Sequence, residues 1–318
     1  MISLRYHIVS VAAVFLALAL GVVLGSTSVS ERLLSSVVAD RDSLDGQTEQ
    51  LRAERDALRA QVEGADRFGR AIGPAAVQGQ LNGRTVVLIS DHRVDPADRD
   101  ALKELLSAAG ASVTGELQLT DGVTDPYRAD QLRQVVNELL PTGVQVPASA
   151  DPGTLAGGLL GPVSLLDPRA GQPHASAEER TAALAGLTAG GFAHVAQEVK
   201  PAQAAVVLTR ARVEDESAGA RSAILARMAT QLDRSGAGTV LAGTAGSADG
   251  SGPVGIVRAD NSIASLVSTV DNTDTAAGRV AVIMALREQF DRQSGHYGSA
   301  GNAQGRCPVR EADRGRAR

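Results

Sequence analysis

Residues 84–90 read RTVVLIS, a short apolar run rich in β-branched side chains. Such a run predicts a strand that is buried on both faces of a sheet. The dipeptide Asp95-Pro96 follows, and this cap-then-proline pair predicts the start of a helix. A strand and then an Asp-Pro helix start appear again within residues 111–140. This β-α-β-α order predicts an α/β fold class with a mostly parallel sheet covered by helices.

The same alternation continues downstream, so we expect the α/β domain to occupy residues 80–293. Residues 142–173 are rich in glycine and proline, and we expect a linker or irregular insert there. Residues 294–318 are expected to form a disordered tail. The remaining apolar segments and strands are expected at 192–195, 204–209, 239–242, 255–257 and 262–270, and the remaining helices at 175–189, 217–234 and 275–292.

Upstream of this domain, residues 29–67 carry apolar side chains at heptad spacing in a segment rich in charged residues and free of proline. This pattern predicts a coiled-coil stalk, through which the chain would self-associate or bind a protein partner. The alternative is a single amphipathic helix that packs on its own domain. Glycines and a proline between residues 64 and 79 are expected to end the helix. The expected seam consists of Leu34, Val37, Leu44, Leu51, Leu58 and Val62.

Residues 8–24, IVSVAAVFLALALGVVL, contain no charged side chain. Their length is at the short end of the roughly 17–25 residues that a transmembrane helix needs. We expect a single membrane span, with residues 1–7 in the cytoplasm because Arg5 lies on the short side, and the bulk of the chain extracytoplasmic. The alternative is a cleaved secretory signal. Either reading sends the bulk of the chain across a membrane and predicts a location in the cell envelope.

Composition and motifs exclude several function classes. The net charge of −5 and the scarcity of aromatic residues argue against nucleic acid as a partner. Cys307 is the single cysteine, so no disulfide framework is expected. The G-x-S-x-G, H-E-x-x-H, C-x-x-C and G-x-x-x-x-G-K motifs are absent, and no two histidines have ligand spacing. We therefore expect no enzymatic activity and no evident cofactor.

The most informative polar cluster is VDNTDTAAGR, which lies where a predicted strand leads into the last predicted helix. Its candidate residues are Asp271, Asn272, Asp274, Thr275 and Arg279. Loops at the carboxyl ends of parallel strands bind ligands in α/β domains, so the two carboxylates could hold a ligand or a hard cation and the arginine could pair with an anion. The alternative is a structural turn, in which Asp274 or Thr275 caps the helix and Arg279 pairs with Asp271. Residues 91–93 form a weaker candidate of the same kind.

Several of these segments together resemble the actinobacterial MctB family over residues 1–292. They are the opening MISLRYH, the apolar run with its GVVLG end, the heptad stalk, the strand at 85–90 and the segment at 270–279. The resemblance implies an envelope protein of copper transport or copper homeostasis, sometimes described as a channel of the outer membrane. SteB-like relatives imply a different role, in which a single-pass protein acts with a membrane partner in daughter-cell separation. Copper is implied by this resemblance alone.

Overall fold

The structure is a computed structural model that describes residues 4–146, 151–195, 197–211 and 217–308, except for side chains at residues 4–5, 24–40 and 42–43. Two compact units comprise Met1–Ala65 and Asp66–Arg318. Helix α1 spans Leu4–Val77, so its last turns belong to the second unit. This unit begins before the boundary that we expected at residue 80.

Helix α1 ends at Val77, just before Gly79 with its φ of 74° and so within the expected range of residues 64–79, but it does not break at Gly64, Gly69 or Gly73-Pro74 as expected. The reason is packing against helix α9, Ala276–Phe290. The Asp66 carboxylate accepts a hydrogen bond of 2.6 Å from the Ala276 amide at the start of that helix. A Cβ at Gly69 would lie 3.0 Å from the Ala276 Cβ, so the glycine permits close approach of the two backbones. Favourable tertiary contacts therefore outweigh the poor helix propensity of glycine.

The second unit contains a seven-stranded sheet with the order β3-β2-β1-β4-β5-β6-β7. All neighbouring strands are parallel except β2 and β3, which confirms the predicted α/β fold with a mostly parallel sheet. The chain moves outward in one direction from β1 to β2 and in the other from β4 to β5, so β1 and β4 flank the switch point. The strands are β1 Thr85–Asp91, β2 Ser112–Leu119, β3 Ala193–Val195, β4 Ala204–Thr209, β5 Thr239–Gly243, β6 Ser268–Val270 and β7 His296–Tyr297.

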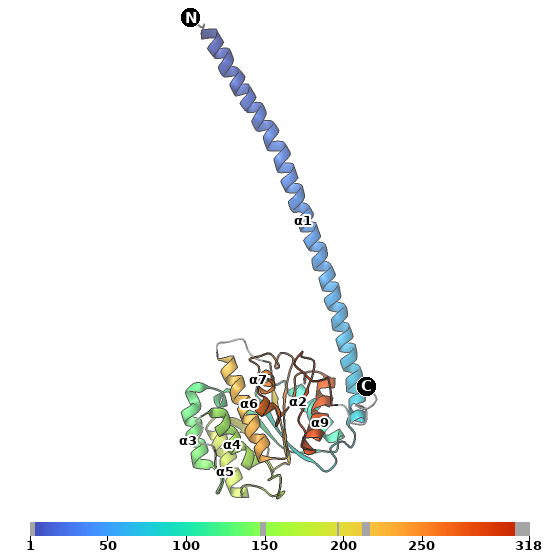
Figure 1. Ribbon diagram of the computed structural model, residues 1–318, viewed down its shortest axis with the longest axis vertical. Coiled ribbons are helices and arrows are strands. Elements are labelled where there is room, and N and C mark those ends of the chain that lie inside the picture. The colour runs from blue at the N-terminus through green and yellow to red at the C-terminus, as the bar shows by residue number, and fades with distance from the viewer. Residues whose placement is uncertain (1–3, 147–150, 196, 212–216, 309–318) are drawn as a thin grey trace. The chain divides into compact units, whose positions relative to one another are not determined.

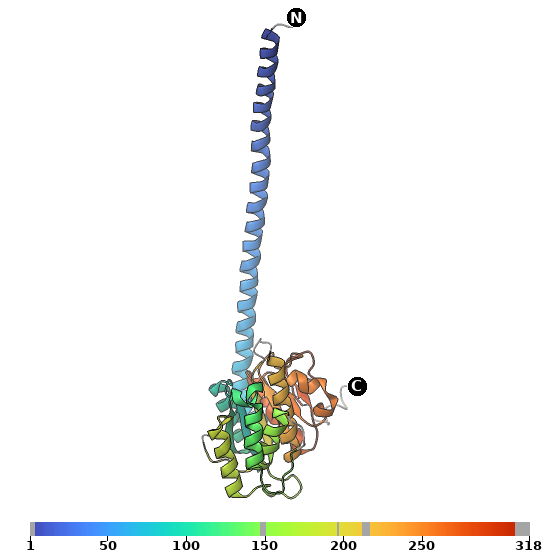
Figure 2. The same cartoon turned by 90° about the vertical axis from the view of Figure 1, so that its left-hand side faces the viewer.

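Helices cover both faces of the sheet (Figure 1). Alternate strand residues face opposite sides, so Val86 and Leu88 join one buried core whereas Val87 and Ile89 join the other. The first core lies under α2, α9 and the end of α1; the second lies under the helix layer that faces the viewer in Figure 2. The helices of the unit besides α1 and α9 are α2 Pro96–Ala108, α3 Ala129–Leu139, α4 Pro152–Ser164, α5 Ala177–Ala189, α6 Ala218–Ser235, α7 Pro253–Ala259 and α8 Asn261–Ala264, with short 3-10 turns η1 Asp121–Val123 and η2 Pro126–Arg128.

Helix α4 lies within residues 142–173, where we expected an irregular insert, and that expectation is wrong. The helix is almost entirely buried. Its glycines at positions 153, 157 and 161 recur every four residues and face α6. A Cβ at Gly157 would lie 2.7 Å from the Met228 carbonyl oxygen. The glycines that suggested a flexible segment are therefore the residues that let two helices pack closely.

Two of the later predicted strands are wrong as well. Residues 255–257 lie in α7, which begins with Pro253 at its first turn. Of residues 262–270, only the last three form a strand, β6, whereas α8 covers the beginning. The Asp260 carboxylate caps α8 by accepting a 2.9 Å hydrogen bond from the Ser262 amide. The proline at the start of α7 and the cap of α8 therefore favour helices in these two segments, although their apolar side chains suggested strands.

The chain from Ser294 to Pro308 is part of the folded unit, which corrects the expectation of a disordered tail for those residues. Strand β7 pairs in parallel with β6, and both of its residues are buried. The Tyr297 hydroxyl donates a 2.6 Å hydrogen bond to the Glu288 carboxylate of α9. The other residues expected in the tail, 309–318, lie outside the described residues.

Candidate functional site

The carboxylate of Asp271, the first polar candidate, forms a buried ion pair beyond the end of β6. Its Oδ2 lies 2.7 Å from Nη1 of Arg258, and these side chains are only 1% and 3% exposed. Arg258, on α7, also donates to the Tyr297 carbonyl at 2.7 Å. The other oxygen of Asp271 accepts a 2.7 Å hydrogen bond from the Ser299 amide. Protein donors thus occupy this carboxylate, and the network connects β6, β7 and α7.

Arg279, the second charged candidate, turns away from Asp271, so the expected pair between them is wrong. Its Nη1 lies 3.0 Å from the Asp98 carboxylate on α2 and donates to the Thr273 carbonyl at 2.9 Å. This arginine therefore ties the loop after β6 to the neighbouring helix. Because its side chain is almost fully buried, a solvent-borne anion has little access to it.

The remaining candidates of this segment form a capped turn. Thr275 is the N-cap of α9 and accepts a 3.1 Å hydrogen bond from the Gly278 amide. Asn272 donates from its side chain to the Thr275 hydroxyl at 3.3 Å, and Asp274 accepts from the Ala245 amide at 3.1 Å. The structure therefore gives these residues the roles of the structural alternative, with different partners for the charged groups.

The weaker candidate at the end of β1 is also internally paired. Arg93 lies 2.5 Å from the buried Asp91 carboxylate. Burial raises the pKa of Asp91, but the hydrogen bonds and charge of Arg93 outweigh this effect and hold the pKa below its usual value. His92 lies 3.2 Å from the same carboxylate. The carboxyl edge of the sheet is thus rich in charges that satisfy one another.

The first unit presents the predicted heptad seam and the apolar segment. Leu44, Leu51, Leu58 and Val62 are 60% to 64% exposed in the single chain. The side chains of two further seam residues, Leu34 and Val37, lie outside the described residues. Near the amino terminus, Tyr6–Val23 is long and apolar enough to cross a membrane.

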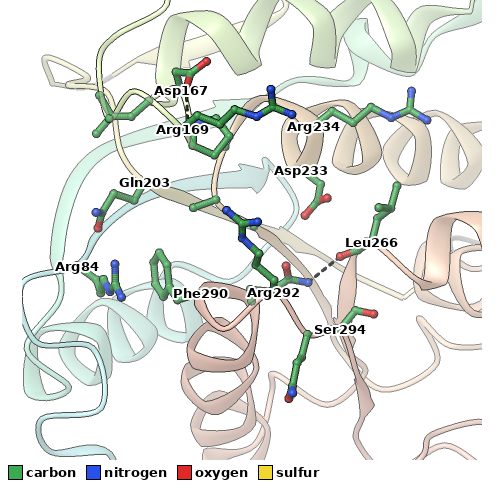
Figure 3. Close-up of a pocket in the computed structure, with 18 of the residues that line it drawn as sticks. Arg84, Asp167, Arg169, Gln203, Asp233, Arg234, Leu266, Phe290, Arg292 and Ser294 are labelled. Carbon is green, nitrogen blue, oxygen red and sulfur yellow. Dashed lines mark hydrogen bonds between the residues drawn. The ribbon is translucent and has the colours of Figure 1, made fainter.

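A cavity in the α/β unit lies at the opposite, amino-terminal edge of the sheet and was missed in the sequence. It has a volume of about 490 Å³. Arg84 and Gln203 precede β1 and β4, while Asp233 and Arg292 come from the carboxyl-terminal ends of α6 and α9 (Figure 3). These residues are far apart in the chain and form no local motif. No signal in the sequence alone could have brought them together.

Four arginines line this cavity, which we call the arginine cleft. Among the residues that the structure describes, none of the four forms an ion pair with a carboxylate. The Arg84 guanidinium lies 4.5 Å from the centre of the Phe290 ring, a cation–π contact that leaves its charge uncompensated. The four are Arg84, Arg169, Arg234 and Arg292.

The two carboxyl groups of the cleft are engaged differently. Burial raises the pKa of Asp233 to about 7, although the Thr239 amide and the charge of Arg234 oppose the shift. Its Oδ1 accepts a 2.9 Å hydrogen bond from that amide. Asp167 instead accepts from the backbone amides of Ala170 and Arg169, which lower its pKa. Near neutral pH the cleft therefore carries more positive than negative charge.

Ligands for a metal ion do not gather within the described part of the chain, where no group of three or more His, Cys, Asp and Glu side chains is placed to hold one. The single cysteine, Cys307, is partly buried. Burial, and to a lesser extent the charge of Glu288, raises the pKa of this thiol to about 11 against the opposing charge of Arg287. Since the thiolate is the form that binds metal, this thiol is a poor ligand at neutral pH.

Comparison with known proteins gives matches along nearly the whole chain. The family model described as "Copper transport outer membrane protein, MctB" matches residues 1–308. The Copper transporter MctB of Mycobacterium tuberculosis (strain ATCC 25618 / H37Rv) is 38% identical over 313 residues, which cover 97% of this chain and 99% of that protein. The Copper transporter MctB of Mycobacterium leprae (strain TN) is 36% identical over 316 residues, with the same coverage.

Proposed function

Because the chain belongs to the MctB family, we propose that it is a membrane-anchored envelope protein that acts in copper transport or copper homeostasis. The observation that carries this proposal is the match to proteins named copper transporters along 97% of the chain. The match includes the apolar segment, the heptad segment and the α/β unit together. We further propose that the protein is not an enzyme, since its best-defined polar clusters hold the fold together.

The anchor is a single span formed by Tyr6–Val23. Eighteen helical residues extend about 27 Å, close to the thickness of the hydrocarbon core. The uninterrupted course of α1 from Leu4 to Val77 supports a retained anchor over a cleaved signal. Arg5 on the short side supports a cytoplasmic amino terminus and an extracytoplasmic α/β unit.

Transport by this chain requires further copies or a partner, because a single helix encloses no pathway for an ion. The exposed heptad side chains of α1 supply a surface for that assembly, and we propose that they form a coiled coil. Burying three leucines that are now 61% to 64% exposed would contribute several kcal/mol per helix, at about 1.5–3 kcal/mol for a fully buried side chain.

Deletion of the gene in its own host tests the copper role. The deletion strain should grow poorly in elevated copper and hold an altered amount of cellular copper, measured by mass spectrometry. The full chain should restore both, and a chain without residues 6–23 should not. Equal copper tolerance and equal copper content in the deletion and parent strains would refute the proposal.

A second candidate function, supported by the exposed heptad seam, is a scaffold that acts with a membrane partner in envelope remodelling or daughter-cell separation. It is tested by cross-linking from the heptad segment in living cells. The double change Leu44→Asp and Leu51→Asp should abolish partner capture, because two charges enter the seam. The matched control is Gln50→Asp with Ala53→Asp, which adds two charges off the seam. Equal capture by both variants would contradict the scaffold, and separation defects at normal copper tolerance would favour it.

A further inference from the structure

We propose that the arginine cleft binds a small polyanion, a ligand whose anionic oxygens belong to phosphate or carboxylate groups. The cleft has a volume of about 490 Å³, within the range of about 300–1,000 Å³ that is typical of small-molecule sites. It lies at the amino-terminal edge of the sheet, away from the paired charges at the carboxyl edge. The inference concerns the α/β unit alone and does not depend on the copper role.

The charges of the cleft form the first argument. Four arginines from four separate parts of the fold line the cleft: the segment before β1, the loop after α4, the end of α6 and the residue after the C-cap of α9. Within the described residues they lack carboxylate partners, in contrast to the arginines at the carboxyl edge. Guanidinium groups bind phosphate and carboxylate through two parallel hydrogen bonds, which matches this class of ligand.

The backbone of Arg292 is the second argument. It is the one described residue other than glycine with a positive φ, 60°. It follows Asp291, the C-cap of α9, and so occupies the position where helices usually place glycine. A long side chain there stores backbone strain that glycine would avoid. Figure 3 shows the Arg292 guanidinium extending into the middle of the cleft, with Asp233 on one side and Gln203 on the other. Arg292 therefore keeps a strained backbone while its guanidinium brings a positive charge to the position where a ligand would lie.

The Asp233 carboxyl is the third argument, because its protonation changes what the cleft offers. In its neutral form it donates a hydrogen bond to an anionic oxygen; in its ionised form it repels the ligand and competes for the guanidiniums. His174 lies outside the lining of the cleft, and its ring nitrogen Nε2 is 2.8 Å from the Ser235 carbonyl oxygen at the end of α6. The charged groups that line the cleft together with this carboxyl are Arg84, Asp167, Arg169, Arg234 and Arg292, and the charge of Arg234 acts on it directly.

Calorimetric titration of the full chain in detergent micelles tests the proposal. The probes are inorganic pyrophosphate and tricarballylate, which separate phosphate from carboxylate as the preferred source of anionic oxygen. The decisive variant is Arg292→Gly, which removes the charge and relieves the strained backbone. The matched control is Arg133→Ala on α3, which removes one positive charge outside the cleft, where it pairs with an exposed aspartate.

We expect Arg292→Gly to weaken probe binding at least tenfold while its thermal unfolding midpoint equals or exceeds that of the native chain. Arg133→Ala should bind as the native chain does. A purely structural role for Arg292 predicts the same affinity in both variants, and that result would overturn the proposal. Failure of the native chain to bind either probe at millimolar concentration would overturn it as well.

The pH dependence gives an independent readout. With a pKa of about 7, the neutral fraction of the Asp233 carboxyl falls about tenfold from pH 6 to pH 8. Titration of the probe itself affects the native chain and Asp233→Asn equally. The ratio of affinities at pH 6 and pH 8 should therefore be about tenfold larger for the native chain than for Asp233→Asn. Equal ratios would show that this carboxyl does not face the bound anion.

Discussion

Replacing Arg258 with methionine should destabilise the α/β unit more than replacing any other paired arginine described above. Methionine keeps much of the aliphatic volume but removes the charge and all donors. Arg258 pairs with Asp271 and also donates to the Thr269 hydroxyl at 2.9 Å and to the Tyr297 carbonyl at 2.7 Å. The change therefore leaves a carboxylate that is 1% exposed without its counter-charge and a carbonyl of β7 without its donor.

The expected loss is about 4 kcal/mol in the free energy of unfolding. Breaking a buried ion pair by removing one partner costs about 3–5 kcal/mol, because an uncompensated charge stays buried. The Ser299 amide still donates to Asp271 at 2.7 Å and holds the loss within this range. Since domains are stable by only about 5–15 kcal/mol, such a loss is a large part of the total.

Two matched variants, Arg279→Met and Arg133→Met, give smaller expected losses with which the loss in Arg258→Met can be compared. Arg279→Met breaks a pair whose aspartate is 28% exposed, so water can solvate the remaining charge and the loss should be smaller, about 2 kcal/mol. Arg133→Met breaks a pair whose aspartate is 91% exposed, and its loss should stay below about 1 kcal/mol. The order of the three losses follows from the burial of the carboxylate left behind.

Urea unfolding of the full chain in micelles, followed by circular dichroism, measures the three losses. Hydrogen exchange measured by mass spectrometry should show faster exchange at residues 294–302 in Arg258→Met, because the network holds β7 beside β6. A loss below about 1 kcal/mol for Arg258→Met, with unchanged exchange at β7, would refute the assignment of this pair as a structural support.

Three further predictions concern single residues. Burial raises the folded-state pKa of Asp233 from 3.8 to about 7, so the folded chain binds this proton more tightly than the unfolded chain, and stability falls as pH rises from about 4 to about 7. Asp233→Asn should therefore raise the free energy of unfolding by about 2 kcal/mol at pH 8, after allowance for partial solvation of the carboxylate, and by little at pH 4. Urea unfolding at both pH values measures the difference. Gly157→Ala should lower the free energy of unfolding by about 2–3 kcal/mol in the same assay, because the new Cβ would lie 2.7 Å from the Met228 carbonyl oxygen and α4 must move away from α6. An unchanged free energy of unfolding would mean that this helix pair is loosely packed. Gly298→Ala should accelerate exchange in β7, since Gly298 has a φ of 140° and a Cβ there would collide with the Asp271 carboxylate; unchanged exchange would contradict that clash.

Much of the secondary structure could be predicted because its signals are local. The strands at 85–91 and 204–209 are short apolar runs rich in β-branched residues, and the Asp95-Pro96 pair starts α2 where the sequence indicated. The capping of α9 by Thr275 is local as well, because the Thr275 hydroxyl accepts a hydrogen bond from the amide of Gly278, three residues further along the chain. The family resemblance, confirmed by matches along nearly the whole chain, rests on such local segments in a fixed order.

The candidate site could be predicted only in part, because its partners come from distant segments. Asp271 and Arg279 were found as polar residues after a strand, but their partners, Arg258 and Asp98, lie on other elements. The glycine content suggested an irregular segment where α4 is a buried helix. Helix propensity describes the isolated segment and does not include α6, which packs against those glycines in the folded chain.

The sequence by itself determined the apolar segment, the heptad pattern, the α/β class and the family, because periodicity and capping act between residues close along the chain. Only the tertiary structure decided that β7 completes the sheet and that four arginines share one cleft with Asp233. The cleft depends on parallel strands beginning at a common edge, where the segments before them meet the carboxyl-terminal ends of the helices. Residues from 84 to 292 then become neighbours through the sheet, and no local pattern records that proximity.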